Sequence, residues 1–268
     1  MIADGDLDLI KRAARAAGEL AQRLRRSGLT TVAKTDGTPV TNADLEVDAL
    51  LKDLLIRARP DYGWLSEETA DDPARLGRRR LFVVDPIDGT RSYLKDKPWW
   101  AVSIAVVEAG RPTVGVVHAL DVEETYEAVA GGGALRNGRP IAASATAVVE
   151  DCAMLGDRPM FAHPAWPQPW PPMRIETRNS IAYRLCLVAA GVFDAALALS
   201  AKSEWDLAAA DLIATEAGCR VTTHRGETLT YNQPIPSAAS LVCAGPLLHP
   251  LILRRVEPID RDRATQAD

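Results

Sequence analysis

Cysteine is scarce in this sequence of 268 residues, and its pattern excludes two classes of site. The four cysteines are scattered and no Cys-x-x-Cys pair occurs, so the sequence predicts neither a zinc site nor a disulfide framework. The four histidines are equally isolated, and the zinc-binding pattern His-Glu-x-x-His is absent. We therefore expect reduced thiols in the core of a cytoplasmic protein.

Long apolar runs and an excess of positive charge are also missing. The sequence has no apolar stretch of about 18 residues, which a membrane-spanning helix needs, and its first residues are too acidic for a signal peptide. A net charge of −5 argues against a protein that binds nucleic-acid polymers, because such a protein needs a basic surface. A small anionic substrate is still compatible with this charge, since bound metal ions reverse the local sign.

The spacing of apolar residues predicts a mixed α and β protein. Helical spacing covers residues 7–26, 42–58, 179–190 and 203–217, and a last short helix follows Pro246. Shorter apolar runs predict strands at 81–84, 100–107, 113–120, 125–130, 192–199, 219–222 and 241–244, with a type I′ turn at Asn137-Gly138. We divide the chain near residue 140, into an α+β part with an antiparallel meander and a part in which strands and helices alternate.

Four acidic clusters carry the chemistry of the sequence. They are Lys34 to Asp44, Trp64 to Glu68, Asp85 to Thr90 and Glu204 to Asp206. In the third cluster an apolar strand ends directly in Asp85, Pro86 forbids a continued ladder, and Asp88-Gly89 has turn chemistry. The two carboxylates would meet at the carboxyl end of a strand, where they repel each other unless a cation such as Mg²⁺ lies between them.

Each cluster also has a purely structural interpretation. The patterns that end in Asp44 and Asp206 fit capping boxes at helix starts. Glu67-Glu68 fits a solvated loop tip, and Asp-Pro-Ile-Asp-Gly alone fits an ordinary Asx turn. All four together in one chain favour a single metal site.

With these motifs the sequence resembles the inositol monophosphatase-like superfamily of Mg²⁺-dependent, lithium-sensitive phosphatases. The resemblance runs from about Lys34 to Ala244 and depends on Asp-Pro-Ile-Asp-Gly-Thr, an upstream Ser-Glu-Glu and a downstream Trp-Asp before an Ala-rich helix. It implies an α/β fold, a layered α-β-α-β-α sandwich of the inositol monophosphatase and fructose-1,6-bisphosphatase type. Residues 1–140 would bind metal and phosphate, and residues 141–268 would recognise the substrate.

The resemblance also implies two or three Mg²⁺ ions. Glu67, Asp85 and the carbonyl of Ile87 would hold the first ion, and Asp85, Asp88 and Asp206 the second. These ions would lower the pKa of a bound water and offset charge on the leaving oxygen. No protein nucleophile is then required, which agrees with the lack of a suitably placed Cys or Ser–His pair.

The remaining site residues follow from the same resemblance. Asp44 and Thr90 would orient and deprotonate the attacking water, and Glu67 would also touch a third ion through water. The amides of Gly89 and Thr90 would cradle the phosphate. Lys34 corresponds to the lysine of a flexible loop that covers the site in this superfamily.

The motifs favour a 3′(2′),5′-bisphosphate nucleotidase. The strings Lys202-Ser-Glu-Trp-Asp and Leu-x-Tyr-Asn232 resemble that branch, and Lys202 would meet a second phosphate unless it is an ordinary surface lysine. Inositol monophosphatase is the first alternative, although Leu199 stands where the inositol-specific branch places a glutamate that binds hydroxyls. The usual Gly-Ser or Gly-Thr before the helix at 181–190 is Asn-Ser here, which puts Ser180 in doubt as a substrate contact.

Histidinol-phosphatase stays open because Asp-Gly-Thr-Arg91-Ser occurs in those enzymes, and fructose-1,6-bisphosphatase is a further alternative. A scaffold of the same fold without activity would lack metal ligands, yet all of the expected carboxylates are present. The superfamily resemblance also implies a homodimer, and Trp99-Trp100 together with Trp166 and Trp170 are candidate interface anchors. Alternatively, these tryptophans pack within one chain.

Overall fold

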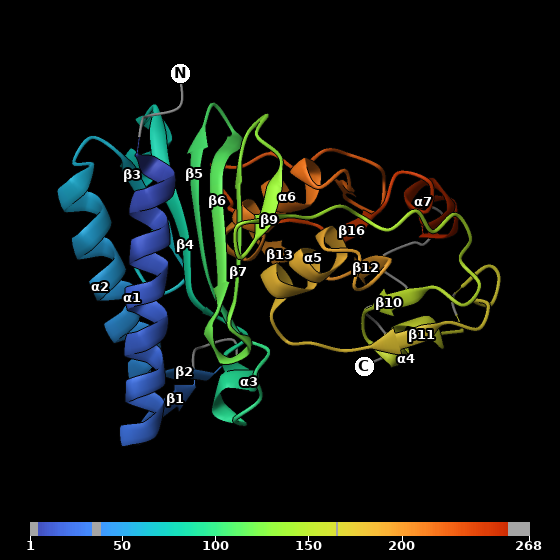
Figure 1. The fold of residues 1–268 in the computed structure, drawn as a ribbon, viewed down its shortest axis with the longest axis horizontal. Coiled ribbons are helices and arrows are strands. Elements are labelled where there is room, and N and C mark those ends of the chain that lie inside the picture. Colours follow the sequence, from blue (N-terminus) through green and yellow to red (C-terminus); the bar gives the residue numbers. More distant parts are fainter. Residues whose placement is uncertain (1–4, 34–38, 165, 257–268) are drawn as a thin grey trace.

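The computed structural model describes residues 5–33, 39–164 and 166–256, and its elements stack in five layers (Figure 1). Helices α1 (Asp6–Ser27) and α2 (Asn42–Ala58) cover one face of a seven-stranded sheet. Helices α5 (Ile181–Ala189) and α6 (Glu204–Glu216) lie between that sheet and a five-stranded sheet, and α7 (His249–Val256) covers the far face. This arrangement confirms the predicted α-β-α-β-α sandwich.

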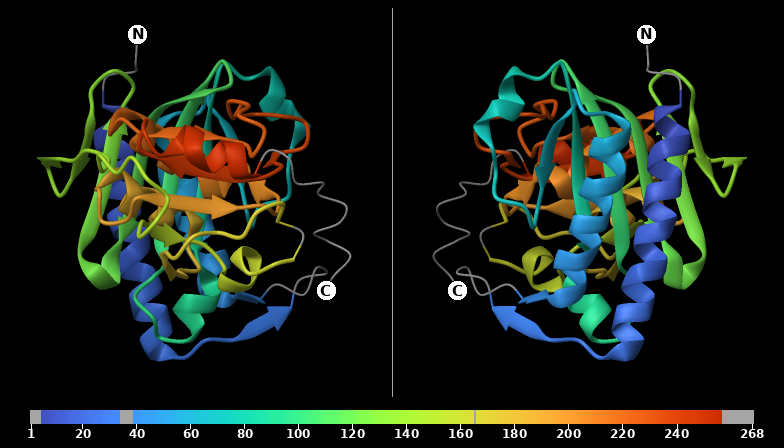
Figure 2. Two further views of the ribbon diagram at one scale, coloured as in Figure 1. Left: turned by 90° about the vertical axis from the view of Figure 1, so that its right-hand side faces the viewer. Right: turned by 90° about the vertical axis from the view of Figure 1, so that its left-hand side faces the viewer.

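The first layer forms where the sequence predicts it. Helix α1 buries Ile10, Ala14, Ala17 and Ala21 against the sheet, at helical spacing. Figure 2 shows α1 and α2 side by side over the same face. Among the described residues, no helix combines the length and the apolarity that a membrane crossing requires.

The seven-stranded sheet has the order β3-β4-β5-β6-β7-β8-β9. Its strands are β3 (Gly63–Ser66), β4 (Arg80–Asp88), β5 (Ala101–Glu108), β6 (Arg111–Ala119), β7 (Glu124–Val129), β8 (Ala134–Arg136) and β9 (Arg139–Pro140). Only β3 and β4 are parallel, and the others form the predicted meander. Asn137 and Gly138 both have positive φ, as a type I′ turn between β8 and β9 requires.

One expectation about β4 is wrong. The strand does not stop at Asp85 but continues to Asp88, with Asp85 opposite Ser103 and Asp88 opposite Ala101 on β5. The register shift between these pairs forms a bulge that holds Pro86, whose missing N–H is tolerated where the ladder is interrupted. The bulge turns the strand at the point where it carries its two aspartates.

The five-stranded sheet has the order β11-β10-β12-β16-β14. Its strands are β10 (Ala153–Leu155), β11 (Arg174–Glu176), β12 (Ala195–Ala198), β14 (Arg220–Thr222) and β16 (Leu241–Ala244). The strand predicted at 192–199 is shorter because residues 191–194 form the turn that follows α5. The remaining short elements are β1 (Thr31–Ala33), β2 (Pro39–Thr41), the 3₁₀ helix η1 (Pro73–Gly77), α3 (Thr90–Leu94), the 3₁₀ helix η2 (Leu120–Val122), α4 (Arg158–Phe161), β13 (Lys202–Ser203) and β15 (Ser237–Ala238).

Helix α6 lies close to the seven-stranded sheet because small residues face each other across the contact. A Cβ atom on Gly115 of β6 would lie 2.8 Å from the carbonyl oxygen of Ala209 on α6. Only glycine therefore permits this approach. The close packing fixes the position of the helix that carries Asp206.

The tryptophans proposed as interface anchors pack within one chain. Trp100 is fully buried, and its indole N–H donates to Asp121 at 2.7 Å. Trp166 and Trp170 contact each other edge to face in the core beneath α7, and Trp99 is half-buried against Arg178. These side chains give no support for a dimer, which stays a prediction from the superfamily resemblance. Light scattering at micromolar concentration tests it, and a monomer mass would reject it.

Candidate active site

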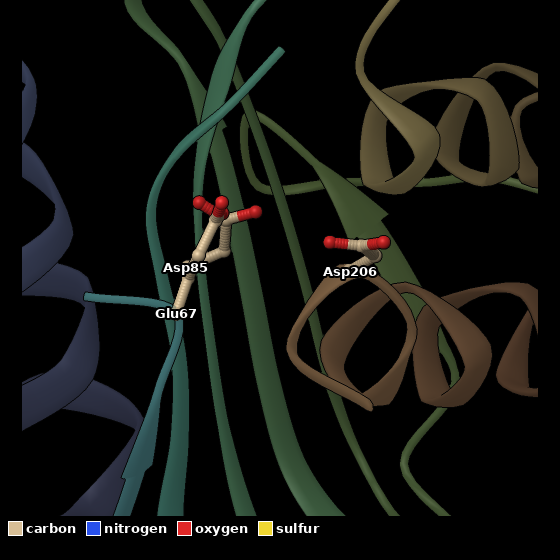
Figure 3. A group of neighbouring side chains, drawn as sticks. All are labelled: Glu67, Asp85 and Asp206. Carbon is tan, nitrogen blue, oxygen red and sulfur yellow. The ribbon is translucent and has the colours of Figure 1, made fainter. Parts of the chain in front are cut away.

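Three carboxylates from distant parts of the sequence meet between the seven-stranded sheet and α6. The parallel register pairs Ser66 with Val84, so Glu67 and Asp85 follow at the same end of β3 and β4. Asp206, in the first turn of α6, faces both of them (Figure 3). One oxygen from each carboxylate lies within 4.8 Å of the other two.

This donor set fits a hard divalent cation. Mg–O bonds are about 2.1 Å long, so oxygens on opposite sides of one Mg²⁺ ion lie about 4.2 Å apart. Burial raises the pKa of Asp85, and the negative charges of Glu67, Asp88 and Asp206 raise it further. Burial also raises the pKa of Asp206, and the negative charge of Asp88 is the next largest cause of that rise. A cation would relieve this repulsion, so the residues suit a metal ion in both spacing and charge.

Asp88 belongs to the same charge cluster, but its carboxylate is turned toward the start of α5. It accepts hydrogen bonds from the Ser180 hydroxyl at 2.6 Å, from Ala182 N–H at 2.6 Å and from Ile181 N–H at 3.2 Å. Burial raises the pKa of Asp88 to about 6, and these donors partly oppose the shift. The structure thus gives Asp88 a structural contact that the motif does not reveal, and its role as a metal ligand stays a prediction.

Gly89 follows Asp88 in a conformation that favours glycine. Its φ is +94°, and a Cβ atom there would lie 2.9 Å from the carbonyl oxygen of Trp99 and 3.0 Å from the amide nitrogen of Ser180. Both neighbours are backbone atoms that cannot easily move. The glycine therefore allows the bulge of β4, the start of α3 and the start of α5 to meet.

The predicted pair of Asp44 and Thr90 is in contact. Asp44 completes the capping box of α2, since its Oδ2 accepts the N–H of Thr41 at 2.7 Å and the Thr41 hydroxyl at 2.6 Å. Its Oδ1 faces the Thr90 hydroxyl at 3.3 Å, and that hydroxyl also lies 3.2 Å from the carbonyl oxygen of Ile87. Asp44 thus caps α2 and also contacts Thr90, while its role in activating water stays a prediction. Burial raises the pKa of this carboxyl.

The residues proposed for substrate contact are placed differently from one another. Ser180 is fully buried, and besides its bond to Asp88 its hydroxyl accepts the N–H of Tyr183 at 3.0 Å. The Lys202 ammonium group donates to the Ser200 hydroxyl at 2.7 Å and to the carbonyl of Ala201 at 3.1 Å. Burial lowers the pKa of Lys202, while the charge of Asp206 opposes that shift. Lys34 lies outside the described residues.

Sequence reasoning missed two charged residues beside the site. Arg184 is a buried arginine in α5, a helix that is otherwise mostly apolar, and its guanidinium lies 3.8 Å from Asp157. Asp48 is buried one turn beyond Asp44 on α2 and accepts hydrogen bonds from the hydroxyls of Ser66 and Thr69. These two donors flank Glu67, so Asp48 holds the segment that presents it. A charge on a buried helix stripe is the signal that could have identified both residues.

Comparisons with known proteins agree with this geometry. The model of the inositol monophosphatase family matches residues 6–261. A histidinol-phosphatase of Mycobacterium tuberculosis is 35% identical over 236 residues, covering 83% of this chain and 86% of the relative. A 3′(2′),5′-bisphosphate nucleotidase CysQ of Aggregatibacter actinomycetemcomitans is 30% identical over 239 residues, covering 82% and 85%. The solved structure of an IMPase from Thermotoga maritima has a TM-score of 0.81 at 28% identity, covering 93% of this chain and 96% of that one.

Proposed function

We propose that this chain, which belongs to the inositol monophosphatase family and is a metal-dependent phosphomonoesterase, hydrolyses histidinol phosphate. Its family is shown by the match over residues 6–261. The substrate proposal is carried by the similarity to a histidinol-phosphatase, at 35% identity over most of both chains. It replaces the nucleotidase that the sequence motifs favoured, because the CysQ relative is less similar, at 30%.

The site residues supply the proton transfer and the orientation that hydrolysis needs. Mg²⁺, when bound, lowers the pKa of water and offsets the charge of the phosphate. Because Thr41 occupies Oδ2 of Asp44, Oδ1 is the atom that accepts the proton of the Thr90 hydroxyl. With its proton directed at Asp44, the Thr90 oxygen can accept a hydrogen bond from the attacking water. Thr90 and Asp44 therefore form a relay that removes the proton of that water.

A carboxylate is available for the positive groups of histidinol phosphate. Asp157 precedes α4 with an exposed side chain, and its negative charge raises the pKa of Lys202. A substrate ammonium group could pair with it. Leu199, in contrast, packs against the apolar cluster beneath α7 and offers a polyol no hydrogen-bond acceptor. These observations favour an amino alcohol phosphate over an inositol phosphate.

A bisphosphate nucleotide is the second candidate, and one observation favours it. The guanidinium of Arg184 interacts electrostatically with Asp88, and the ammonium of Lys202 interacts with Asp206 and Asp88. Two cations beside the carboxylate cluster suit a second phosphate group. Asp157 would repel that phosphate, so the two candidates depend on different side chains.

The deciding experiment compares kcat/KM for histidinol phosphate, 3′-phosphoadenosine 5′-phosphate, inositol 1-phosphate and fructose 1,6-bisphosphate with Mg²⁺. We expect histidinol phosphate to exceed the others by roughly tenfold or more, a difference of about 1.4 kcal/mol in transition-state stabilisation. Asp157→Asn should raise KM for histidinol phosphate, and Lys202→Met should leave that KM nearly unchanged. Higher kcat/KM for the bisphosphate nucleotide, with loss of its turnover in Lys202→Met, would overturn the proposal in favour of the second candidate.

A further inference from the structure

Glu204 joins the first turn of α6 to a distant loop. It is the first residue of the helix, two positions before Asp206, and its side chain is buried. Its carboxylate accepts the backbone N–H of Asn232 at 2.7 Å and that of Gln233 at 2.9 Å. Its own N–H donates to the carbonyl of Pro236 at 2.9 Å. The helix start that carries Asp206 is therefore bound to residues 232–236.

Arg75 joins the same loop to the segment that follows Glu67. Its side chain is 1% exposed and donates to the side-chain oxygen of Asn232 at 2.7 Å and to the carbonyl of Gln233 at 2.9 Å. It also forms a two-pronged ion pair with Asp71, at 2.6 and 2.9 Å. Arg75 lies on η1, which packs against β3, the strand that ends just before Glu67. The guanidinium thus makes four hydrogen bonds, two to Asp71 and two to the loop.

We propose that Arg75, Glu204 and the loop residues Asn232 and Gln233 form a clasp that sets the position of Asp206 relative to Glu67. The two carboxylates come from segments that approach each other only in the folded chain, and Arg75 and Asn232 are 157 positions apart. Mg²⁺ accepts little deviation from octahedral geometry, so a small displacement of α6 would weaken the ion's binding. Arg75 and Glu204 are positioning residues, because they touch the loop rather than the metal or the substrate.

The clasp gives two sequence motifs a common explanation. Glu-Trp-Asp and Leu-x-Tyr-Asn both suggested a substrate, yet the structure shows that Glu204 of the first and Asn232 of the second are hydrogen-bonded to each other. The two motifs therefore meet in one contact of the fold, where the backbone N–H of Asn232 donates to the Glu204 carboxylate. The inference relies on the proposed function only in taking Glu67, Asp85 and Asp206 as metal ligands.

The test measures the Mg²⁺ concentration that gives half of the maximal rise in melting temperature. Arg75→Met removes the donors at similar volume, and Glu204→Gln turns an amide N–H toward a backbone N–H. The matched control is Tyr231→Phe, which removes a 2.7 Å hydrogen bond between the same loop and Asp211 of α6 without touching the clasp. We expect both clasp variants to need roughly tenfold more Mg²⁺ or more, as for other residues that orient metal ligands. The control should melt earlier without metal but keep the wild-type Mg²⁺ midpoint.

Further variants keep the inference falsifiable if Arg75→Met does not fold. Arg75→Lys retains one cationic donor and should give an intermediate midpoint. The double variant Arg75→Met with Glu204→Gln should need no more Mg²⁺ than the single variant with the higher Mg²⁺ midpoint, because both substitutions act through one contact. Clasp variants that melt earlier yet keep the wild-type midpoint would overturn the clasp. A wild-type protein that Mg²⁺ does not stabilise at all would instead overturn the proposed function.

Discussion

The Ser180 hydroxyl donates a hydrogen bond of 2.6 Å to the Asp88 carboxylate, although the two residues are 92 positions apart. This bond joins the bulge of β4 to the first turn of α5. A residue that the motif assigns to the metal is thereby also part of the contact between the two halves of the chain. The double role changes what a substitution at this position should do.

Asp88→Asn should lose turnover while its melting temperature without metal stays close to that of the wild type. The lost negative charge should lower phosphate release by on the order of 10³-fold, since several kcal/mol of transition-state stabilisation depend on the metal site. Relief of repulsion favours the folded state, but the amide turns one N–H toward the donors at the start of α5, which costs about 1–2 kcal/mol. Melting temperature and Mg²⁺-dependent phosphate release check both effects. Retention of more than about a tenth of wild-type activity would contradict a ligand role for Asp88.

Thr90→Val should lower kcat by roughly 10²- to 10⁴-fold with little change in KM, because it removes the hydroxyl that links water to Asp44. Thr90→Ser keeps the hydroxyl and is the matched control, so it should retain most of the activity. Steady-state kinetics at saturating Mg²⁺ separate the two variants. Equal losses in Val and Ser variants would show that the methyl group matters and that the relay does not exist.

Gly115→Ala should destabilise the protein and weaken Mg²⁺ binding together. The added Cβ atom meets the backbone oxygen of Ala209 at 2.8 Å and must push α6 away from β6. Such overpacking typically costs about 1–3 kcal/mol. Gly77→Ala, where no heavy atom lies within 4 Å of the new Cβ, is the control and should change little. Urea unfolding and the Mg²⁺ midpoint are the measurements, and an unchanged midpoint in Gly115→Ala would argue against a link between this packing and the metal site.

The stability of the metal-free protein should depend on pH through Asp211. Burial raises the pKa of this carboxyl to about 6, while the hydrogen bonds from Tyr231 and Thr215 oppose the shift. The folded state therefore holds the proton of Asp211 more tightly than the unfolded chain does. The stabilisation of the folded state that results is complete below the pKa of Asp211 in the unfolded chain, and it is lost as the pH rises through about 6.

Asp211→Asn removes this titration and provides the comparison. When the pH falls from 7.5 to 5, the free energy of unfolding of the wild type should rise by about 1.4 kcal/mol more than that of the variant. This is the free energy that corresponds to one pH unit of titration below a pKa of about 6. Urea unfolding at 25 °C in EDTA measures the difference. Identical pH dependence of the two proteins would show that Asp211 does not titrate in this range.

The sequence predicts the local elements of this protein well. Helices α1 and α2 begin and end within two residues of the expected positions, because apolar spacing and the capping box of Thr41 and Asp44 are local signals. The meeting of Glu67, Asp85 and Asp206 followed from motifs that resemble a known superfamily. Periodicity alone could not have placed Asp206 there, since α6 comes from the other half of the chain.

What the sequence did not reveal depends on contacts between distant segments. The bulge in β4 needs the pairing with β5, and nothing local shows that Pro86 can remain inside a strand. The contact of Asp88 with α5 and that of Arg75 with Asn232 join residues 92 and 157 positions apart. Such pairs have no periodic signal, and a motif that singles out one partner does not indicate the other.

The most direct test of the whole account is phosphate release from histidinol phosphate by the wild type and by Asp85→Asn, as Mg²⁺ rises from a chelated solution to millimolar levels. Asp85 is one of the three carboxylates that meet in the cluster. We predict that the wild type is inactive in EDTA and that its rate rises to saturation with Mg²⁺. The variant should remain about 10³-fold slower or more at every concentration. Undiminished wild-type turnover in EDTA, or near-normal turnover by Asp85→Asn, would contradict a metal-dependent phosphatase built on these residues.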